Sequence, residues 1–75
     1  MKIIKGNYLK ENNSERQIEI LVLENKDDGV KGIDLTLLTE IEQEEIKQLR
    51  MDYEEKTKKY MKAFRYFKRD KIKRG

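Results

Sequence analysis

Apolar residues gather in a few short runs, and the spacing within each run predicts its structure. Residues 2–9 alternate loosely between apolar and polar types, which predicts a strand. Residues 17–24 predict a stronger strand, with Ile18, Ile20 and Val22 on one face and Leu21 and Leu23 on the other. Apolar residues on both faces indicate that this strand is buried on both sides toward its end. The polar segment 10–15 is short enough to join the two strands as an antiparallel hairpin.

Turn-forming residues separate these runs. The segment 10–15 contains two asparagines, which tolerate the left-handed backbone of a tight turn. Gly6 interrupts the first strand and marks a bulge or a close approach of another backbone. Asp28 and Gly29 form a good turn pair, and residues 30–35 predict a third, short strand after it. Asp34 is placed to cap the turn that follows.

A long helix is predicted next. Thr39 and Glu42 fit the capping box that begins many helices. After them, apolar residues recur at helical spacing, at Ile46, Leu49, Tyr53, Tyr60 and Phe64. Three acid-before-base pairs four residues apart support the same helix, namely Asp52 with Lys56, Glu54 with Lys58 and Glu55 with Lys59. The pattern predicts one helix over residues 39–62.

Such a helix is longer than the sheet it would cover. From residue 40 to residue 62 it would measure roughly 34 Å, whereas three or four short strands span about 20 Å. The overhang leaves apolar residues such as Met51 or Met61 uncovered. A second copy of the chain would cover them, so we expect a homo-oligomer.

The last dozen residues decide the fold class. Residues 64–67, Phe-Arg-Tyr-Phe, are rich in the aromatic types that favour strands. We therefore expect residues 63–67 to form a closing strand that pairs with the N-terminal hairpin. An unbroken helix to about residue 70 is the alternative, because no helix-breaking residue intervenes. The preferred prediction is an α+β fold, in which one long helix is inserted before the last strand of a small antiparallel sheet.

Length and composition limit what the chain can do. Its 75 residues predict one domain, 1–75, made of a hairpin and short strand (1–35), the helix (39–62), and a closing strand with a basic tail (63–72). The absence of Cys and His removes disulfides, the commonest metal ligands and the commonest general base. We therefore expect a non-enzymatic protein without a cofactor.

Two further absences bear on location. No apolar run reaches the roughly 18 residues of a membrane span. The first residues lack the apolar segment of a signal peptide. We therefore expect a cytoplasmic protein without a membrane partner.

Charge is distributed unevenly along the chain. The net charge is +3, but residues 40–55 hold seven acidic and two basic side chains, whereas residues 61–75 hold seven basic and one acidic. The helix dipole accounts for acid at a helix start and base at its end, yet the basic surplus extends past the predicted helix. Proteins that bind single strands pair basic grooves with aromatic platforms. The sequence thus predicts a site for nucleic acid or another anionic ligand at Arg65, Lys68, Arg69 and Lys71, with Tyr66 stacking on the ligand.

The same residues have a plainer interpretation. The aromatic side chains then belong to the core, and the basic ones form a solvated tail. The glutamates of the helix likewise match a solvated face better than a metal site, because no EF-hand spacing or His accompanies them.

Residues 65–72 carry a family likeness. Their sequence, Arg-Tyr-Phe-Lys-Arg-Asp-Lys-Ile, resembles the closing R-x-F-x-x-D-[RK]-I signature of WYL-type domains, which have an SH3-like, Sm-like barrel. The layout of the chain resembles short phage and prophage proteins assigned this fold. The resemblance implies an SH3/Sm-like sheet or barrel with its last strand at 63–67 and a tight turn at 69–71. It also implies that Phe67 and Ile72 are core residues and that Arg65 lies at the barrel mouth.

The resemblance also carries a functional expectation. WYL-type domains are thought to bind anionic or nucleotide-like ligands, which implies a phage-derived binding module for nucleic acid or a nucleotide-like ligand. The Trp-Tyr-Leu tripeptide that names the family is absent from this chain, as is a DNA-binding helix-turn-helix. The alternative is a phage accessory protein that binds and inhibits a host protein or defence system through its helix face.

Overall fold

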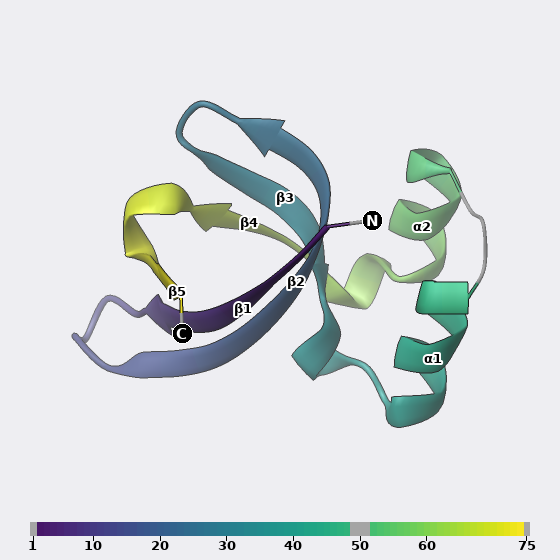
Figure 1. Ribbon diagram of the computed structural model, residues 1–75, viewed down its shortest axis with the longest axis horizontal. Coiled ribbons are helices and arrows are strands. Elements are labelled where there is room, and N and C mark those ends of the chain that lie inside the picture. The colour runs from purple at the N-terminus through teal and green to yellow at the C-terminus, as the bar shows by residue number, and fades with distance from the viewer. Residues whose placement is uncertain (1, 49–51, 75) are drawn as a thin grey trace.

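An antiparallel sheet and two short α-helices make up the fold, which the computed structural model describes over residues 2–48 and 52–74. The strands are β1 (Ile3–Leu9), β2 (Glu15–Lys26), β3 (Gly29–Asp34), β4 (Phe64–Lys68) and β5 (Ile72–Arg74). The α-helices are α1 (Glu40–Gln48) and α2 (Tyr53–Lys59), and the 3-10 helices are η1 (Leu35–Leu37), η2 (Met61–Ala63) and η3 (Arg69–Lys71). Figure 1 shows the strands on one side of the molecule and the α-helices on the other. The predicted α+β class is confirmed.

The described strands form one antiparallel sheet in the order β4-β3-β2-β1-β5. β1 and β2 make the predicted hairpin, with Ile4 opposite Ile20. Its turn holds Asn13 in the left-handed conformation, at φ 65°, which asparagine tolerates. β3 confirms the predicted third strand, and a bulge shifts its register with β2 between Val22 and Glu24.

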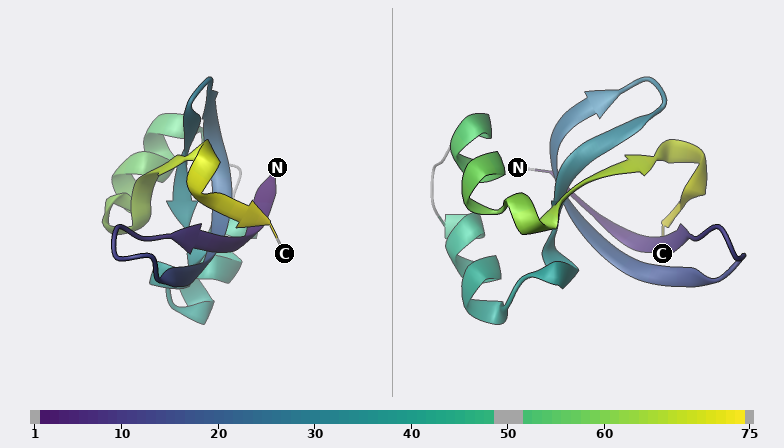
Figure 2. Two further views of the ribbon diagram at one scale, coloured as in Figure 1. Left: turned by 90° about the vertical axis from the view of Figure 1, so that its left-hand side faces the viewer. Right: turned by 180° about the vertical axis from the view of Figure 1, so that it is seen from behind.

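The C-terminal segment supplies both edges of the sheet. β4 confirms the predicted closing strand, so the alternative of a helix to residue 70 is wrong. However, β4 pairs with β3. The strand that pairs with the hairpin is β5, whose Ile72 lies opposite Tyr8 of β1. Only η3, the expected tight turn, separates these edge strands, so the sheet curls strongly (Figure 2). Within the described residues the sheet is not closed, because β4 and β5 remain its two edges.

Side chains protect the edge of β4. The Lys68 backbone N–H donates a hydrogen bond to the Tyr8 hydroxyl at 3.2 Å. The Arg65 guanidinium donates to the Phe64 carbonyl at 2.9 Å. The Tyr8 ring also meets Phe67 edge to face, with ring centroids 5.2 Å apart. An open strand edge is a template for pairing with another chain, so these contacts make such pairing at β4 less favourable.

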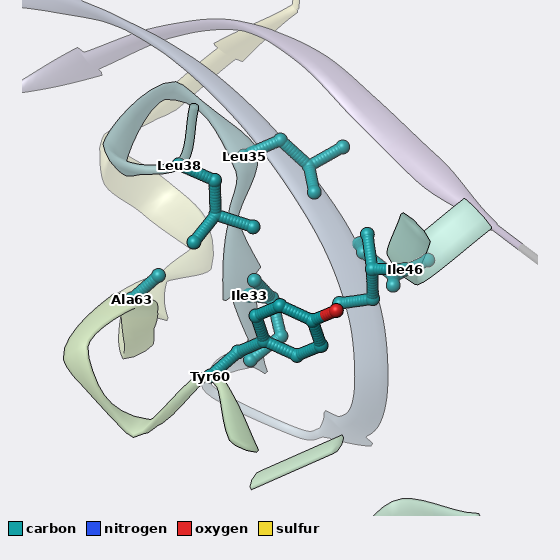
Figure 3. Close-up of a cluster of buried hydrophobic side chains, with 7 residues drawn as sticks. Ile33, Leu35, Leu38, Ile46, Tyr60 and Ala63 are labelled. Carbon is teal, nitrogen blue, oxygen red and sulfur yellow. The ribbon is translucent and has the colours of Figure 1, made fainter. Parts of the chain in front are cut away.

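Two apolar clusters lie on opposite faces of the sheet. The first lies between the sheet and the helices and contains Leu21, Ile33, Leu35, Leu38, Ile46, Tyr60 and Ala63. The Tyr60 ring lies against Ile33 and Ile46 (Figure 3). The second lies within the curl of the sheet and contains Ile4, Ile18, Ile20, Val30 and Phe67, with Tyr8, Val22 and Ile72 packed against it. The adjacent residues Ile20 and Leu21 belong to different clusters, which confirms that the second strand is buried on both faces.

The prediction of one helix over residues 39–62 is wrong. The capping box at its start is confirmed, because Thr39 N–H donates to Glu42 Oε1 at 3.1 Å and Glu42 N–H donates to Thr39 Oγ1 at 3.2 Å. Asp52, however, has extended backbone, with φ −77° and ψ 179°, so α1 and α2 are separate helices. Its carboxylate accepts a hydrogen bond from Glu55 N–H at 2.9 Å and caps the start of α2.

The break removes the predicted overhang of the helix. Glu45 of α1 pairs with Lys59 of α2 and accepts a hydrogen bond from the Tyr60 hydroxyl at 3.1 Å. These contacts join the last part of α1 to the end of α2. Met61 is 67% exposed, whereas Leu49, Met51 and the Tyr53 side chain lie outside the described residues. The expectation of a homo-oligomer loses its length argument and stays a prediction.

Candidate functional site

The five residues predicted to bind an anion lie on β4 and η3. Arg65, Tyr66 and Lys68 belong to β4, and Arg69 and Lys71 belong to η3. Lys71 is half-buried and the other four are exposed. Because side chains alternate along a strand, Arg65 lies on the opposite face of β4 from Tyr66 and Lys68. The five residues are neighbours in sequence, but they do not all face one side of the molecule.

Arg69 holds the turn between β2 and β3. Its Nη2 atom donates to Asn25 Oδ1 at 2.7 Å, to the Lys26 carbonyl at 2.7 Å and to the Gly29 carbonyl at 3.3 Å. Its backbone N–H donates to the Asp28 carbonyl at 3.0 Å. Donors satisfied inside the protein are less available to a ligand, so Arg69 has a structural role at this turn.

Tyr66 also contacts this turn. Its hydroxyl donates a hydrogen bond to the Asp28 carboxylate, which raises the pKa of Tyr66 and lowers the pKa of Asp28. The ring lies so close to Gly29 that a Cβ at that position would come within 2.9 Å of its Cζ and Oη atoms. The side chain remains 39% exposed. Part of the ring is therefore available for stacking, in an orientation that the turn fixes.

The surroundings of the predicted site are acidic. A hollow of about 540 Å³ is lined by Asp27, Asp28, Lys68, Arg69 and Asp70. Three carboxylates thus face two cations, and one of those cations already holds the turn. Like charges repel, so this hollow is a poor place for a phosphate.

A second hollow is strongly basic. It has a volume of about 370 Å³, lies at the start of β1, and is lined by Lys2, Ile3, Ile4, Lys5, Glu19, Lys47 and Arg74. We call it the basic hollow. Its four cations are exposed, and none forms an ion pair with a carboxylate of the described residues. Elsewhere Lys59, Lys62 and Lys73 are each paired with a glutamate.

Distant segments of the chain build the basic hollow. Lys5 lies on β1, Lys47 in the last turn of α1, and Arg74 at the end of β5. β5 approaches β1 closely because Gly6 has no side chain, and a Cβ there would overlap the Lys73 carbonyl oxygen. Gly6 thus marks a close backbone approach, as predicted. No local sequence signal points to this site, because only the β1–β5 pairing brings the two ends of the chain together.

A buried carboxylate lies where β3 ends. Asp34 is 0% exposed, and its Oδ1 accepts hydrogen bonds from Thr36 N–H at 3.1 Å and from the Thr36 hydroxyl at 2.6 Å. Arg16 Nη2 lies 2.8 Å from Oδ2 without a well-directed hydrogen bond, and Arg16 Nη1 donates to Thr36 Oγ1 at 3.3 Å. Asp34 therefore caps η1, as predicted. The part played by Arg16 has no local signal in the sequence, because 18 positions separate it from Asp34.

The described residues contain no group of three or more His, Cys, Asp or Glu side chains arranged to hold a metal ion. They also contain no helix with the length and apolar character needed to cross a membrane. Comparison with known proteins gives no matching family model, no matching curated protein and no matching solved structure.

Proposed function

We propose that this protein is a small non-enzymatic module that binds an anionic partner, either nucleic acid or a nucleotide-like ligand. The observation that supports this function is the basic hollow, where four cations face one carboxylate. Contact between such cations and phosphates releases counterions from a nucleic acid, which favours binding. Because the four cations have no carboxylate partner among the described residues, no ion pair of the protein needs to break first.

The residues predicted from the sequence take a secondary place in this proposal. Arg65, Lys68 and Lys71 add positive charge outside the basic hollow and would contact a ligand long enough to reach them. The exposed part of the Tyr66 ring provides a stacking surface. Arg69 stabilises the turn that orients this ring.

We also propose that the sheet belongs to the SH3-like, Sm-like class. Its two edge strands are consecutive in the chain and are joined only by η3, so they lie near each other although they are opposite edges. The bond from Lys68 N–H to the Tyr8 hydroxyl links β4 to β1 across this gap. Nuclear Overhauser contacts between Tyr8 and the Lys68 amide would support the curled sheet, and their absence would contradict it.

Fluorescence anisotropy with a labelled 12-nucleotide single strand tests the anion-binding function. If the four cations each neutralise one phosphate, log affinity falls with log salt at a slope of about −3, so affinity drops about 50-fold between 50 and 200 mM salt. No binding at 50 mM salt would rule out a nucleic-acid ligand. The nucleotide-like alternative is tested in the same way, with a mononucleotide as the titrant.

Charge reversals locate the site. The variant Lys5→Glu/Arg74→Glu changes the basic hollow, and Lys10→Glu/Lys58→Glu changes the net charge equally at two exposed positions outside it. We expect the first variant to lose at least about ten times more affinity than the second. Equal losses would show that net charge, and not this site, attracts the ligand. Lys68→Glu/Lys71→Glu measures the contribution of the C-terminal residues in the same assay.

A second candidate function is docking on a host protein through the helix layer. Ile41 is 79% exposed and Met61 is 67% exposed. Their chain neighbours Glu42 and Lys62 form an ion pair at 2.8 Å, which brings the two segments that carry these apolar residues close together. In a pull-down from host lysate, Ile41→Arg should abolish capture of a specific protein and Glu54→Lys/Glu55→Lys should test the acidic face. Capture that neither variant reduces would count against this surface.

A further inference from the structure

A polar hollow continues the basic hollow along the β1–β2 hairpin. It has a volume of about 480 Å³, and its walls include Lys5, Asn7, Gln17, Glu19 and Thr36. Lys5 and Glu19 line both hollows, and they are opposite each other in the β1–β2 register. The two hollows are therefore adjacent parts of one groove. Each has the size typical of a site for a small ligand.

The two parts of the groove differ in chemistry. The basic hollow presents ammonium and guanidinium groups, whereas the polar hollow presents the neutral amides of Asn7 and Gln17, which are cross-strand partners. An amide side chain offers both donors and an acceptor. Asn7 Nδ2 donates to Glu15 Oε1 at 3.3 Å, which leaves its carbonyl oxygen available. The Gln17 side chain is exposed and has no hydrogen-bond partner among the described residues.

One wall of the polar hollow is rigid. Thr36 is fixed by two hydrogen bonds to the buried Asp34 and by a third from Arg16. The Thr36 hydroxyl is already hydrogen-bonded within the protein, so Thr36 shapes the wall of the hollow. Hydrogen bonds to a ligand would come from the amide side chains. A wall that is already ordered loses little conformational entropy when a ligand binds.

We infer that the groove binds a nucleotide unit, with its phosphate in the basic hollow and its uncharged sugar or base edge against Asn7 and Gln17. This inference rests on the proposed anion-binding function and adds a requirement to it. A site that reads only charge binds any polyanion of equal charge equally well. A site with this groove favours a ligand whose phosphate is joined to a neutral group with hydrogen-bond donors and acceptors.

The test compares two ligands in the same titration. One is a 12-nucleotide single strand, and the other is an inorganic polyphosphate chain of similar charge. Gln17→Leu should weaken binding of the strand about 5-fold and change binding of polyphosphate by less than about 2-fold. Lys5→Glu should weaken binding of both ligands. The matched control Gln48→Leu, at an exposed position of α1 that lines neither hollow, should leave both unchanged.

The outcomes separate the two proposals. If neither ligand binds, the proposed function fails and the inference fails with it. If both bind equally and Gln17→Leu affects neither, the anion-binding function stands and the nucleotide inference is overturned. A mononucleotide, adenosine monophosphate, serves as a third probe: displacement of the strand assigns the groove to a free nucleotide-like ligand, and failure to displace it assigns the groove to a polymer. Thermal melts of each variant verify that it is folded.

Discussion

The buried pair of Asp34 and Arg16 should stabilise the fold far more than an exposed ion pair, and a double-mutant cycle measures the difference. Asp34 is 0% exposed, and the Arg16 side chain is 33% exposed. Arg16→Met keeps most of the apolar stem but leaves a buried carboxylate without its cation. Breaking a fully buried pair costs about 3–5 kcal/mol, and the partial exposure of Arg16 reduces this to about 2 kcal/mol.

Asp34→Ala should cost more than the loss of Arg16. It removes both hydrogen bonds to Thr36 as well as the ion pair. The cap, which is the bond from Thr36 N–H, contributes about 1 kcal/mol, and the bond from the Thr36 hydroxyl to the charged carboxylate about 2 kcal/mol, so we expect a loss of about 3 kcal/mol. Once Asp34 is absent, Arg16 has no buried partner, so the double variant should cost little more than Asp34→Ala alone. The coupling energy is then about 2 kcal/mol.

Urea denaturation monitored by circular dichroism measures the free energy of unfolding of the parent protein and of each variant. Arg16→Met alone should lower the melting temperature by roughly 8–16 °C, since about 1 kcal/mol corresponds to 4–8 °C in a domain of this size. The control cycle uses Lys73→Met and Glu15→Ala, which remove an exposed ion pair at 3.0 Å. A coupling between Arg16 and Asp34 no larger than that of the control pair would refute the reasoning.

Three further predictions follow from other contacts. Hydrogen bonds from Lys59 and Tyr60 lower the pKa of Glu45. The stabilisation that Glu45 gives the folded state is therefore present above the ordinary glutamate pKa and is lost as pH falls through the folded-state pKa. Urea midpoints between pH 7 and pH 3 should therefore fall less in Glu45→Gln than in the parent protein, and parallel curves would contradict this. Arg69→Lys should lower the free energy of unfolding by about 1 kcal/mol and speed amide exchange in the β2–β3 turn. The control Lys68→Ala should do neither. Unchanged amide protection in Arg69→Lys would disprove that the guanidinium holds the turn. Gly6→Ala should push β5 away from β1, because a Cβ there meets the β5 backbone. It should raise amide exchange in β5 with β2–β3 unaffected, and a protected β5 would show that the strand adapts.

Local patterns were sufficient for the strands and for the first helix start. The alternation of residues 18–23 reports burial on two faces, because successive strand residues point in opposite directions and a sheet covered on both sides needs apolar groups on each. The Thr39–Glu42 box predicts the start of α1 because its bonds form between residues three apart. The aromatic run before residue 68 favours a strand for the same local reason.

The helix break had a local signal that a competing pattern concealed. Asp52 and Glu55 form a capping pair three residues apart, but Asp52 also stands four residues before Lys56 and therefore fits a continuous helix. Propensity and side-chain pairs contribute only tenths of a kcal/mol each, so packing chooses between the two. Ile46 and Tyr60 are buried in one cluster, which requires the end of α2 to lie near α1.

The candidate site depended on tertiary structure. A run of basic residues at the end of the chain predicts an anion site only if those side chains are free and face one way. Arg69 instead holds the turn between β2 and β3, through bonds that reach back to Asn25, 44 positions earlier in the sequence. The basic hollow combines Lys2, Lys5, Lys47 and Arg74, and only the β1–β5 pairing and the placement of α1 bring them together. Sequence alone determined which segments form strands and where positive charge is abundant. The pairing of distant segments decided which charges are neutralised and which remain available to a ligand. The reason is that electrostatic energy depends on distance in space and not on separation along the chain.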